Sequence, residues 1–275
     1  MTYLKPVKKP IITLLTDFGL TDPYVAEMKG VIISICPEAV IVDISHQIRK
    51  FDIKMGAFIL ASATPYFPEG SIHVAVVDPG VGTERRAIII VGKRSIYVGP
   101  DNGLMVLSAL KEGIEKVYSI EKRELIREAS TTFHGRDIFA KVAAYMANGL
   151  PPESFGPKIE DFIVPSFSKP IVEDGKVRGE IIHIDNFGNV ITNIGLNNVK
   201  AISVEEGSEL EVVVEGRPFR LKLCSTYGDV PRGRALTLIG SHGFLEIAVN
   251  QGSASEALSL KIGSKLEVYP HKKFR

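Results

Sequence analysis

An acidic residue and two arginines flank a glycine-rich turn in the N-terminal half of the chain. The apolar run 71–77 leads to Asp78, a Pro-Gly-Val-Gly turn follows, and Arg85 and Arg86 precede a second apolar run. In open α/β sheets, ligands collect at the carboxyl ends of strands, where the loops turn back. Asp78 would stand at such an end, with an arginine returning toward it. The alternative is a structural aspartate that caps a turn beside a surface arginine.

A histidine that is well placed for chemistry lies in the sequence Phe-His-Gly-Arg-Asp at 133–137, where a predicted helix opens. An imidazole changes its protonation near neutral pH, so a histidine at a helix start is a natural partner for an acid and an arginine. The presence of His134 favours a functional site around Asp78 over the structural alternative.

A second aspartate ends a predicted strand close to the N-terminus. Asp17 follows the apolar run 11–15 and precedes Gly19. A carboxylate accepts two hydrogen bonds side by side, so Asp17 is suited to the two hydroxyls of a ribose, although it could also be a turn or N-cap residue. Gly80-Val81-Gly82 is only a fragment of a dinucleotide fingerprint, and no phosphate-binding GxxxxGK[ST] motif occurs. A nicotinamide enzyme and a P-loop NTPase are therefore disfavoured.

These residues need a scaffold, and the first half of the chain predicts one in which strands and helices alternate. Such alternation is typical of an α/β domain with a mostly parallel sheet flanked by helices, which we assign to residues 1–166. The segments 87–91 and 95–98 look like a pair of strands joined by a short connection. The other predicted strands are 11–15, 40–44, 71–78 and 116–120, and the predicted helices are 23–36, 50–66, 102–110 and 135–148.

The pattern changes after a proline-rich passage at 149–170 that lacks periodicity, and we place the domain boundary there. Beyond it, apolar and polar residues alternate, which predicts an all-β domain over residues 171–275, a small sandwich or barrel. The predicted strands are 177–185, 190–194, 209–214, 219–223, 235–239, 245–249 and 265–269.

Composition narrows the classes of function. The chain has 275 residues, 45% hydrophobic and 24% charged, which fits a globular protein of two domains. A formal net charge of +1 argues against a nucleic-acid partner, since no basic excess is present to neutralise phosphates. No apolar run approaches the length of a membrane span, and no signal-peptide pattern is present. The 2 cysteines are far apart in sequence, which predicts a reduced, cytoplasmic protein.

Six stretches of the sequence together resemble the adenosine-forming S-adenosyl-L-methionine (SAM) hydrolases. These enzymes are also called SAM hydroxide adenosyltransferases, and they are relatives of the SAM-dependent fluorinases and chlorinases. The resemblance covers nearly the whole chain and implies a homotrimer, with active sites where the α/β domain of one subunit meets the β-rich domain of a neighbour. The stretches are TDFG at 16–19, VVDPGVGTERR at 76–86, GPDNG at 99–103, FHGRD at 133–137, IDNFGNVITNI at 184–194 and SHGFLEIAVNQGSA at 241–254.

The resemblance implies hydrolysis of SAM to adenosine and L-methionine, by in-line attack of water or hydroxide on C5′. SAM is then the substrate, and neither a cofactor nor a metal is expected. In the family, an Asp-Arg-His set distinguishes the water-using enzymes from the halogenases, and it matches Asp78, Arg85 and His134 here. Arg86 is a less favoured match than Arg85. The long loop insertion of the fluorinases has no counterpart near residues 67–71, so hydroxide is favoured over halide.

The main obstacle in this reaction is the weakness of the nucleophile. The sulfonium of SAM makes C5′ electrophilic and methionine leaves as a neutral thioether, whereas water is a weak nucleophile with a pKa of about 15.7. We expect Arg85 to stabilise a forming hydroxide, because a guanidinium remains protonated. Asp78 and His134 are expected to position the water and relay its proton, and the sequence leaves open which of the two takes it.

The resemblance also implies the residues of the nucleoside pocket. Asp17 would hold the ribose hydroxyls. The β-rich domain of the neighbouring subunit would supply Phe187, stacked on adenine, and Asn189, hydrogen-bonded to its edge. Backbone groups near Asn250 and Gln251 would complete the adenine contacts.

For the methionine end, the resemblance implies Asp185, Ser241 and Asp22, which would receive the amino and carboxylate groups. His242 stands where the halogenases carry an arginine, so a weaker contact to the carboxylate is expected there.

Two rival functions remain open from the sequence. Carboxylates and one histidine could instead hold Mg²⁺ or Mn²⁺, which would make the protein a metal-dependent phosphatase or nucleotidase. A third possibility is a catalytically silent protein that binds SAM or adenosine. The residues of the metal hypothesis are Asp17, Asp78, Asp101, Asp137 and His134.

Overall fold

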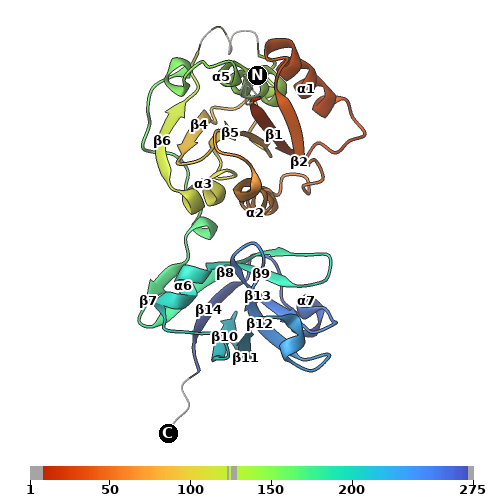
Figure 1. Ribbon diagram of the computed structural model, residues 1–275, viewed down its shortest axis with the longest axis vertical. Coiled ribbons are helices and arrows are strands. Elements are labelled where there is room, and N and C mark those ends of the chain that lie inside the picture. The colour runs from red at the N-terminus through yellow and green to blue at the C-terminus, as the bar shows by residue number, and fades with distance from the viewer. Residues whose placement is uncertain (1–8, 123, 125–128, 272–275) are drawn as a thin grey trace, which may run out of the picture. The chain divides into compact units, whose positions relative to one another are not determined.

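The computed structural model describes residues 9–122, 124 and 129–271. The chain divides into two compact units, Met1–Pro165 and Ser166–Arg275, each with its own sheet and apolar core (Figure 1).

The N-terminal unit is built on a six-stranded sheet with the order β2-β1-β3-β5-β4-β6. Strands β2, β1, β3 and β5 are parallel to one another, whereas β4 pairs antiparallel with both β5 and β6. The prediction of a mostly parallel sheet is corrected to a mixed sheet, because β4 and β5 form a hairpin over residues 93–95, too short a connection for a parallel crossover. The strands are β1 (Ile11–Thr16), β2 (Val40–Ser45), β3 (Ile72–Val76), β4 (Ala87–Gly92), β5 (Ile96–Pro100) and β6 (Ile114–Ser119).

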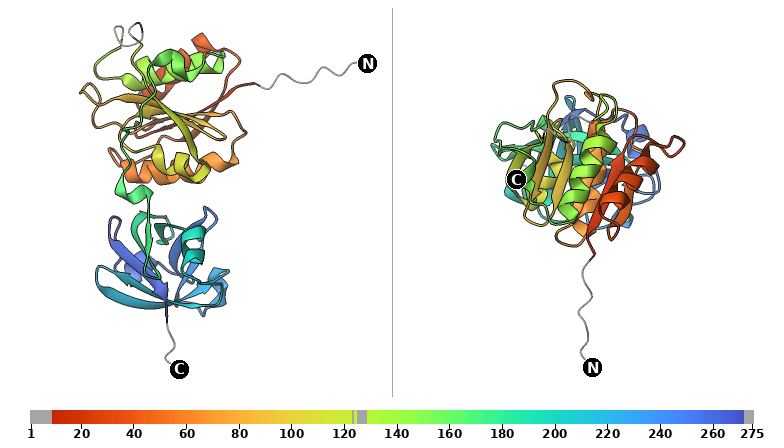
Figure 2. Two further views of the ribbon diagram at one scale, coloured as in Figure 1. Left: turned by 90° about the vertical axis from the view of Figure 1, so that its left-hand side faces the viewer. Right: turned by 90° about the horizontal axis from the view of Figure 1, so that it is seen from above.

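Helices cover both faces of this sheet, as the alternating pattern predicted. Figure 2 shows α1 and α5 on one face and α2 and α3 on the other. Helix α1 buries Val25, Met28 and Ile32, which share one face at helical spacing. The helices are α1 (Tyr24–Ile35), α2 (Ile53–Ala63), α3 (Val106–Glu112), the π-helix η2 (Gly135–Ala140), α5 (Lys141–Ala147) and the short 3-10 turns η1 (Thr64–Tyr66) and η3 (Pro152–Phe155).

The parallel part of the sheet brings two site loops to one edge. Strands β1 and β3 are hydrogen-bonded neighbours, with Thr16 in register with Val76. The loops that follow them carry Asp17 and Asp78, so both carboxylates leave the carboxyl edge of adjacent strands. This is the edge where open α/β sheets bind ligands.

The C-terminal unit is a closed seven-stranded barrel, which settles the choice between sandwich and barrel. The order is β14-β10-β11-β12-β13-β9-β8, closed by pairing of β14 with β8, and the short β7 adds to β8. All seven predicted strands are present, and their inward side chains form the core. The elements are β7 (Ile171–Glu173), β8 (Lys176–Ile184), β9 (Val190–Gly195), α6 (Leu196–Ala201), β10 (Glu209–Val214), β11 (Arg217–Cys224), β12 (Ala235–Ile239), β13 (Phe244–Val249), α7 (Ala254–Ala257), β14 (Lys265–Pro270) and the 3-10 turns η4 (Ser166–Ser168) and η5 (Tyr227–Asp229).

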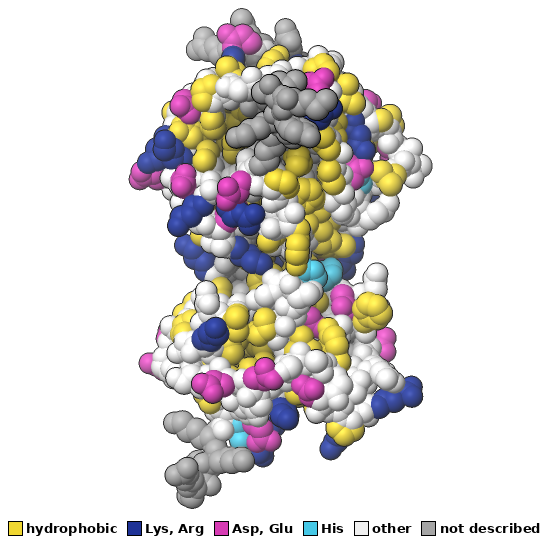
Figure 3. All heavy atoms as spheres, in the orientation of Figure 1, with side chains coloured by type: hydrophobic (Ala, Val, Ile, Leu, Met, Phe, Trp, Pro, Cys, Tyr) yellow, Lys and Arg dark blue, Asp and Glu magenta, His cyan; other side chains and the backbone are white. Residues whose placement is uncertain are grey.

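The surface carries no large single-sign field on the face drawn in Figure 3, where acidic and basic side chains are interspersed over each unit. Within the described ranges, no helix combines the length and apolarity needed to cross a membrane. Cys36 and Cys224 are free and buried.

Candidate active site

Asp78 and Arg85 form a buried ion pair at the carboxyl edge of the N-terminal sheet. Arg85 Nε donates to Asp78 Oδ1 at 3.1 Å, and Arg85 Nη2 donates to Oδ2 at 2.5 Å. Only 9% of the arginine side chain and 4% of the aspartate side chain are exposed. Such a two-point pairing fixes both planes and leaves little freedom to either group.

Two further contacts hold the Arg85 guanidinium. Nη1 donates to the carbonyl of Arg86 at 3.0 Å, and the group lies 5.5 Å from the centre of the buried Phe139 ring. With its contact to His134 Nδ1, the guanidinium uses four of its five N–H groups. One N–H on Nη1 therefore has no partner among the described residues.

His134 completes the set, because Arg85 Nη2 lies 2.9 Å from its Nδ1 atom. A guanidinium can only donate, so Nδ1 must accept and the ring proton of the neutral histidine sits on Nε2. Burial and the positive charge of Arg85 lower the pKa of His134 below its usual 6.5. His134 is thus held neutral, with an Nε2–H donor left for a ligand.

The turn that delivers Arg85 fits closely against the loop before His134. Gly82 has φ +76°, and a Cβ atom there would lie 2.2 Å from the carbonyl oxygen of Thr131. Only glycine allows this approach, so the glycine-rich turn has a steric reason. The contact joins two segments about 50 residues apart and brings the arginine to the histidine.

His134 stands directly before the π-helix η2, a rare element that is often found at functional sites. The next side chains form an anchor: Arg136 donates to Asp137 at 2.7 Å and to Glu27 of α1 at 2.6 Å. Asp137 Oδ2 also accepts from the backbone of Ser130 at 2.8 Å. These bonds fix the loop on either side of the histidine.

A hollow of 370 Å³ opens on Asp78 and His134. One wall is aromatic, because Phe18, Tyr24 and Phe133 pack edge to face with ring centres 5.2 to 5.8 Å apart. The Asp78–Arg85 ion pair and the His134 imidazole lie next to this aromatic wall. Such an arrangement can bind and polarise one small polar molecule next to a larger ligand.

Asp17 and Asp22 lie on the loop between β1 and α1. Asp17 Oδ2 accepts from the backbone N–H of Phe51 at 2.8 Å, and Phe51 holds a left-handed φ of 65°. Within the described residues, the structure shows no hydrogen bond to the other carboxylate oxygen of Asp17. The loop is pinned at Gly19, whose N–H donates to the carbonyl of His46 at 2.8 Å. Asp22 is exposed, and neither aspartate lines the hollow at His134.

Arg86 points elsewhere. It donates to Asp101 Oδ2 from Nε at 3.1 Å and from Nη2 at 2.9 Å, and to Asp161 Oδ1 at 2.9 Å. Asp101 is buried and also accepts from the backbone of Ile163 at 2.9 Å. Arg85 is therefore the arginine that contacts Asp78 and His134, and Arg86 ties the end of this unit to its sheet.

In the C-terminal unit, four of the five predicted residues share a hollow of 510 Å³: Asp185, Phe187, Asn189 and Asn250. Asp185 organises the loop between β8 and β9. Its Oδ1 accepts from the N–H groups of Phe187 and Asn189, each at 2.9 Å, and its Oδ2 accepts from the Asn189 side chain at 2.9 Å. The Phe187 ring is left 80% exposed, as a stacking surface would be.

The other side of this hollow is the turn after β13. Asn250 Nδ2 donates to the carbonyl of Val230 at 2.7 Å, and Gln251 holds a left-handed φ of 54°. Ser241 and His242 lie in the exposed turn between β12 and β13 and do not line the hollow.

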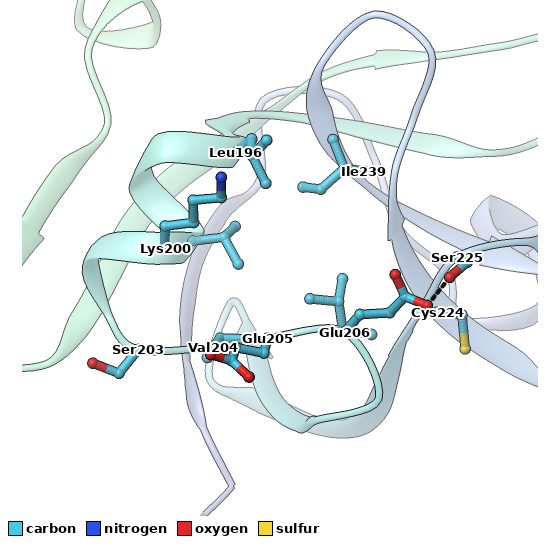
Figure 4. A pocket seen from close by; sticks show the side chains of 11 residues that line it. Leu196, Lys200, Ser203, Val204, Glu205, Glu206, Cys224, Ser225 and Ile239 are labelled. Carbon is cyan, nitrogen blue, oxygen red and sulfur yellow. Dashed lines mark hydrogen bonds between the residues drawn. The ribbon is translucent and has the colours of Figure 1, made fainter.

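A larger hollow of 770 Å³ in the barrel unit has a different character (Figure 4). Its lining mixes aliphatic residues such as Leu196 and Ile239 with polar ones, and its Glu206 carboxylate accepts a hydrogen bond from Ser225. None of the sequence-predicted site residues lies in it. The size of a hollow alone is a weaker guide than convergent polar groups, so its volume does not make this hollow the candidate site.

Two family models together match most of the chain. The SAM hydroxide adenosyltransferase N-terminal domain matches residues 12–156, and the corresponding C-terminal domain matches residues 179–267. The chain belongs to the SAM hydroxide adenosyltransferase family. It is 41% identical to a (R)-S-adenosyl-L-methionine hydrolase of Thermus thermophilus over 260 residues, covering 92% of this chain and 96% of that protein.

Further relatives extend the comparison. A (R)-S-adenosyl-L-methionine hydrolase of Methanocaldococcus jannaschii is 37% identical, over 97% of this chain and 98% of its own. A fluorinase of Nocardia brasiliensis is 31% identical, over 95% and 97%. A crystal structure of an uncharacterised conserved protein from Thermotoga maritima superimposes with a TM-score of 0.83 at 41% identity, covering 94% of this chain and 99% of that one.

Several residues around the candidate site were not identified from the sequence. Phe139, below the Arg85 guanidinium, reads as an ordinary core residue of an amphipathic helix. Tyr227 lines the hollow at Phe187, yet it lies in a polar turn without a motif. Phe133 and Arg136 lie in the stretch FHGRD at 133–137. Their position beside His134 in the sequence was the signal that could have identified them.

Proposed function

We propose that this protein hydrolyses SAM to adenosine and L-methionine by in-line attack of water on C5′. The observation that carries the proposal is the Arg85 guanidinium, bonded at once to Asp78 and His134 beside a hollow. Family membership and the hydrolase names of relatives at 35–41% identity support it.

The geometry supports distinct roles for the three groups. The free N–H of Arg85 and the Nε2–H of His134 are donors, so both would stabilise negative charge growing on the water oxygen. Asp78 then takes the proton, because its oxygens retain lone pairs while His134 Nδ1 is occupied by Arg85. The sum is SAM⁺ and water giving adenosine, methionine and a proton released to solvent. Water rather than halide is the nucleophile we propose.

The substrate would be divided between the N-terminal unit of one subunit and the C-terminal unit of a neighbouring subunit. We propose that Asp17 holds the ribose hydroxyls, Phe187 stacks on adenine, and Asn189 and Asn250 border its edge. Asp185, Ser241 and Asp22 would receive the amino-acid end. Asp185 already accepts three bonds, so its remaining lone pair would serve the ammonium group.

A metal-dependent phosphatase is supported less well. Three of the four carboxylates of that hypothesis are each paired with a different arginine: Asp78 with Arg85, Asp101 with Arg86, and Asp137 with Arg136. Among the described residues, no three histidine, cysteine, aspartate or glutamate side chains gather as a metal site would need. SAM as the substrate, without a cofactor, stays our proposal, and unchanged SAM cleavage in excess EDTA would support it.

We also propose a cytoplasmic homotrimer, with each active site completed by the β-rich domain of a neighbouring subunit. Two inactive variants, His134→Ala and Phe187→Ala/Asn189→Ala, would test this after co-expression. Random assembly in a ring should restore roughly one quarter of the wild-type sites, because an intact site needs one unchanged domain from each variant. Activity that stays absent in the mixture, with each variant folded and trimeric by light scattering, would contradict shared sites.

The reaction itself is tested by turnover of SAM in ¹⁸O-water. We expect free methionine and adenosine labelled in the 5′-hydroxyl, which identifies both the nucleophile and the bond that breaks. Unlabelled 5′-methylthioadenosine would show another chemistry. Adenosine binding without methionine release over hours would identify a silent binding protein instead.

A further inference from the structure

We propose that Glu246 is a positioning residue of the nucleoside pocket, and that it acts by holding Tyr227 as a second aromatic wall beside Phe187. The inference rests on the proposed function, because it concerns how adenine is bound.

Tyr227 is the link between the buried carboxylate and the pocket. Its side chain lines the 510 Å³ hollow with Phe187 and Asn189, and 42% of the residue is exposed. Its hydroxyl donates to Glu246 Oε1 at 2.7 Å. A tyrosine ring anchored at its hydroxyl presents a face in a defined orientation, whereas an unanchored surface ring samples several rotamers.

Glu246 is unusual for its place. It lies in the middle of β13, only 7% exposed. The packing around it is close, since a Cβ atom on Gly240 would lie 2.5 Å from Glu246 Oε2. In the described part of the chain, the hydrogen bond to Tyr227 is the one bond of this carboxylate that the structure shows.

Such an arrangement costs stability. A buried carboxylate with one neutral donor is poorly compensated, and its pKa is raised by burial and by the negative charge of Asp185. An apolar residue would serve the barrel better. The stability of the fold does not explain the Glu246 carboxylate, which makes it a candidate for a functional role. Tyr227, to which it is hydrogen-bonded, faces the pocket.

The loop that bears Tyr227 is held at two points, one on β13 and one on the turn that follows this strand. Glu246 holds its beginning, and Asn250 Nδ2 holds its end at the Val230 carbonyl, 2.7 Å away. Inside the loop, Thr226 and Asp229 cap the 3-10 turn that carries the tyrosine. The position of the loop therefore depends on two side chains, Glu246 of β13 and Asn250 of the turn that follows it.

The test compares the variants Tyr227→Phe, Glu246→Ala and Glu246→Gln, with the exposed Glu205→Gln as the matched control. Adenosine affinity is measured by calorimetry, and SAM turnover gives KM and kcat. We expect Tyr227→Phe and Glu246→Ala each to weaken adenosine binding and raise KM by about 3- to 10-fold, the effect of one hydrogen bond, with kcat within about twofold. Glu246→Gln keeps an acceptor for the hydroxyl and should retain near-normal values.

The double variant Tyr227→Phe/Glu246→Ala should be no worse than either single variant, because both remove the same bond. Unchanged adenosine affinity and KM in Tyr227→Phe would overturn the inference, even if Glu246→Ala fails to fold. A Glu246→Gln variant as impaired as Glu246→Ala would also overturn it, since charge rather than anchoring would then matter. A wild-type protein that neither binds adenosine nor cleaves SAM would instead refute the proposed function itself.

Discussion

Arg85 Nη2 donates to His134 Nδ1 across 2.9 Å, and the same nitrogen donates to Asp78 Oδ2. This one nitrogen thus contacts both the Asp78 carboxylate and the His134 imidazole. It keeps the carboxylate in place and leaves the imidazole with its proton on Nε2.

The tautomer of His134 can be observed directly. The chain has 6 histidines, and in histidine-selective ¹⁵N NMR the signal of His134 can be assigned because it is missing from the spectrum of His134→Asn. We expect this signal to show a neutral ring with its proton on Nε2. The asparagine oxygen can still accept from Arg85 but supplies no donor at the Nε2 position. We therefore expect His134→Asn and His134→Ala to lower kcat/KM alike, by about 10²- to 10⁴-fold. An asparagine variant with near wild-type activity would show that the Nε2–H group is dispensable.

The pH dependence follows from the lowered pKa of His134. A protonated ring could no longer accept from Arg85 and would place two positive charges side by side. The pKa of His134 in the folded protein lies below 6.5, the value of a histidine in an unfolded chain, so above pH 6.5 the ring is neutral and alters neither stability nor kcat/KM. As pH falls through the folded-state pKa, the ring becomes protonated and both quantities decrease. A rate profile and an NMR titration should give the same midpoint, below 6.5. A midpoint above that value would contradict the geometry.

The two adjacent arginines should separate catalysis from stability. Lysine cannot reproduce the paired bonds of a guanidinium, so Arg85→Lys is expected to lower kcat/KM by about 10²- to 10³-fold. Arg86→Lys leaves the buried Asp101 with weaker partners and should lower the free energy of unfolding by about 1 to 3 kcal/mol. Its kcat/KM below the melting range should stay near wild type. Urea unfolding and steady-state kinetics on both variants check this, and the reverse pattern would reassign the arginines.

The sequence was a good guide where burial repeats along a strand or helix. Seven alternating segments became the seven barrel strands, and Asp78 could be placed at a strand end from its apolar run. The direction of β4 was already implied by its short connection to β5, yet the sheet was still predicted as mostly parallel. Strand periodicity reports which faces are buried, and the orientation of a strand depends on its partners.

Contacts between residues that lie far apart in the sequence could not be predicted. Glu246 and Tyr227 lie 19 residues apart and meet because β13 passes beside the loop after β11. The π-helix at 135–140 is also invisible to periodicity, since it depends on packing against other elements, among them α1 and α5. Asp185 was expected to face a ligand, and its bonds to Phe187 and Asn189 show that it also builds the loop that would hold adenine.

Gln251 offers a test of backbone strain beside the pocket. Its φ of 54° is disfavoured for a residue with a side chain, and the turn is closed by a bond from Gly252 N–H to the Val249 carbonyl at 3.1 Å. Gln251→Gly should therefore raise the free energy of unfolding by up to about 1 kcal/mol, and Gln251→Val should lower it by about 1 to 2 kcal/mol. Thermal melts measure both, with Glu205→Val as a control at an exposed position outside the turn. If the backbone here serves adenine, the glycine variant gains stability but binds adenosine more weakly, because the turn loses its preset shape. Equal melting of the glycine and valine variants would mean that the turn carries no strain.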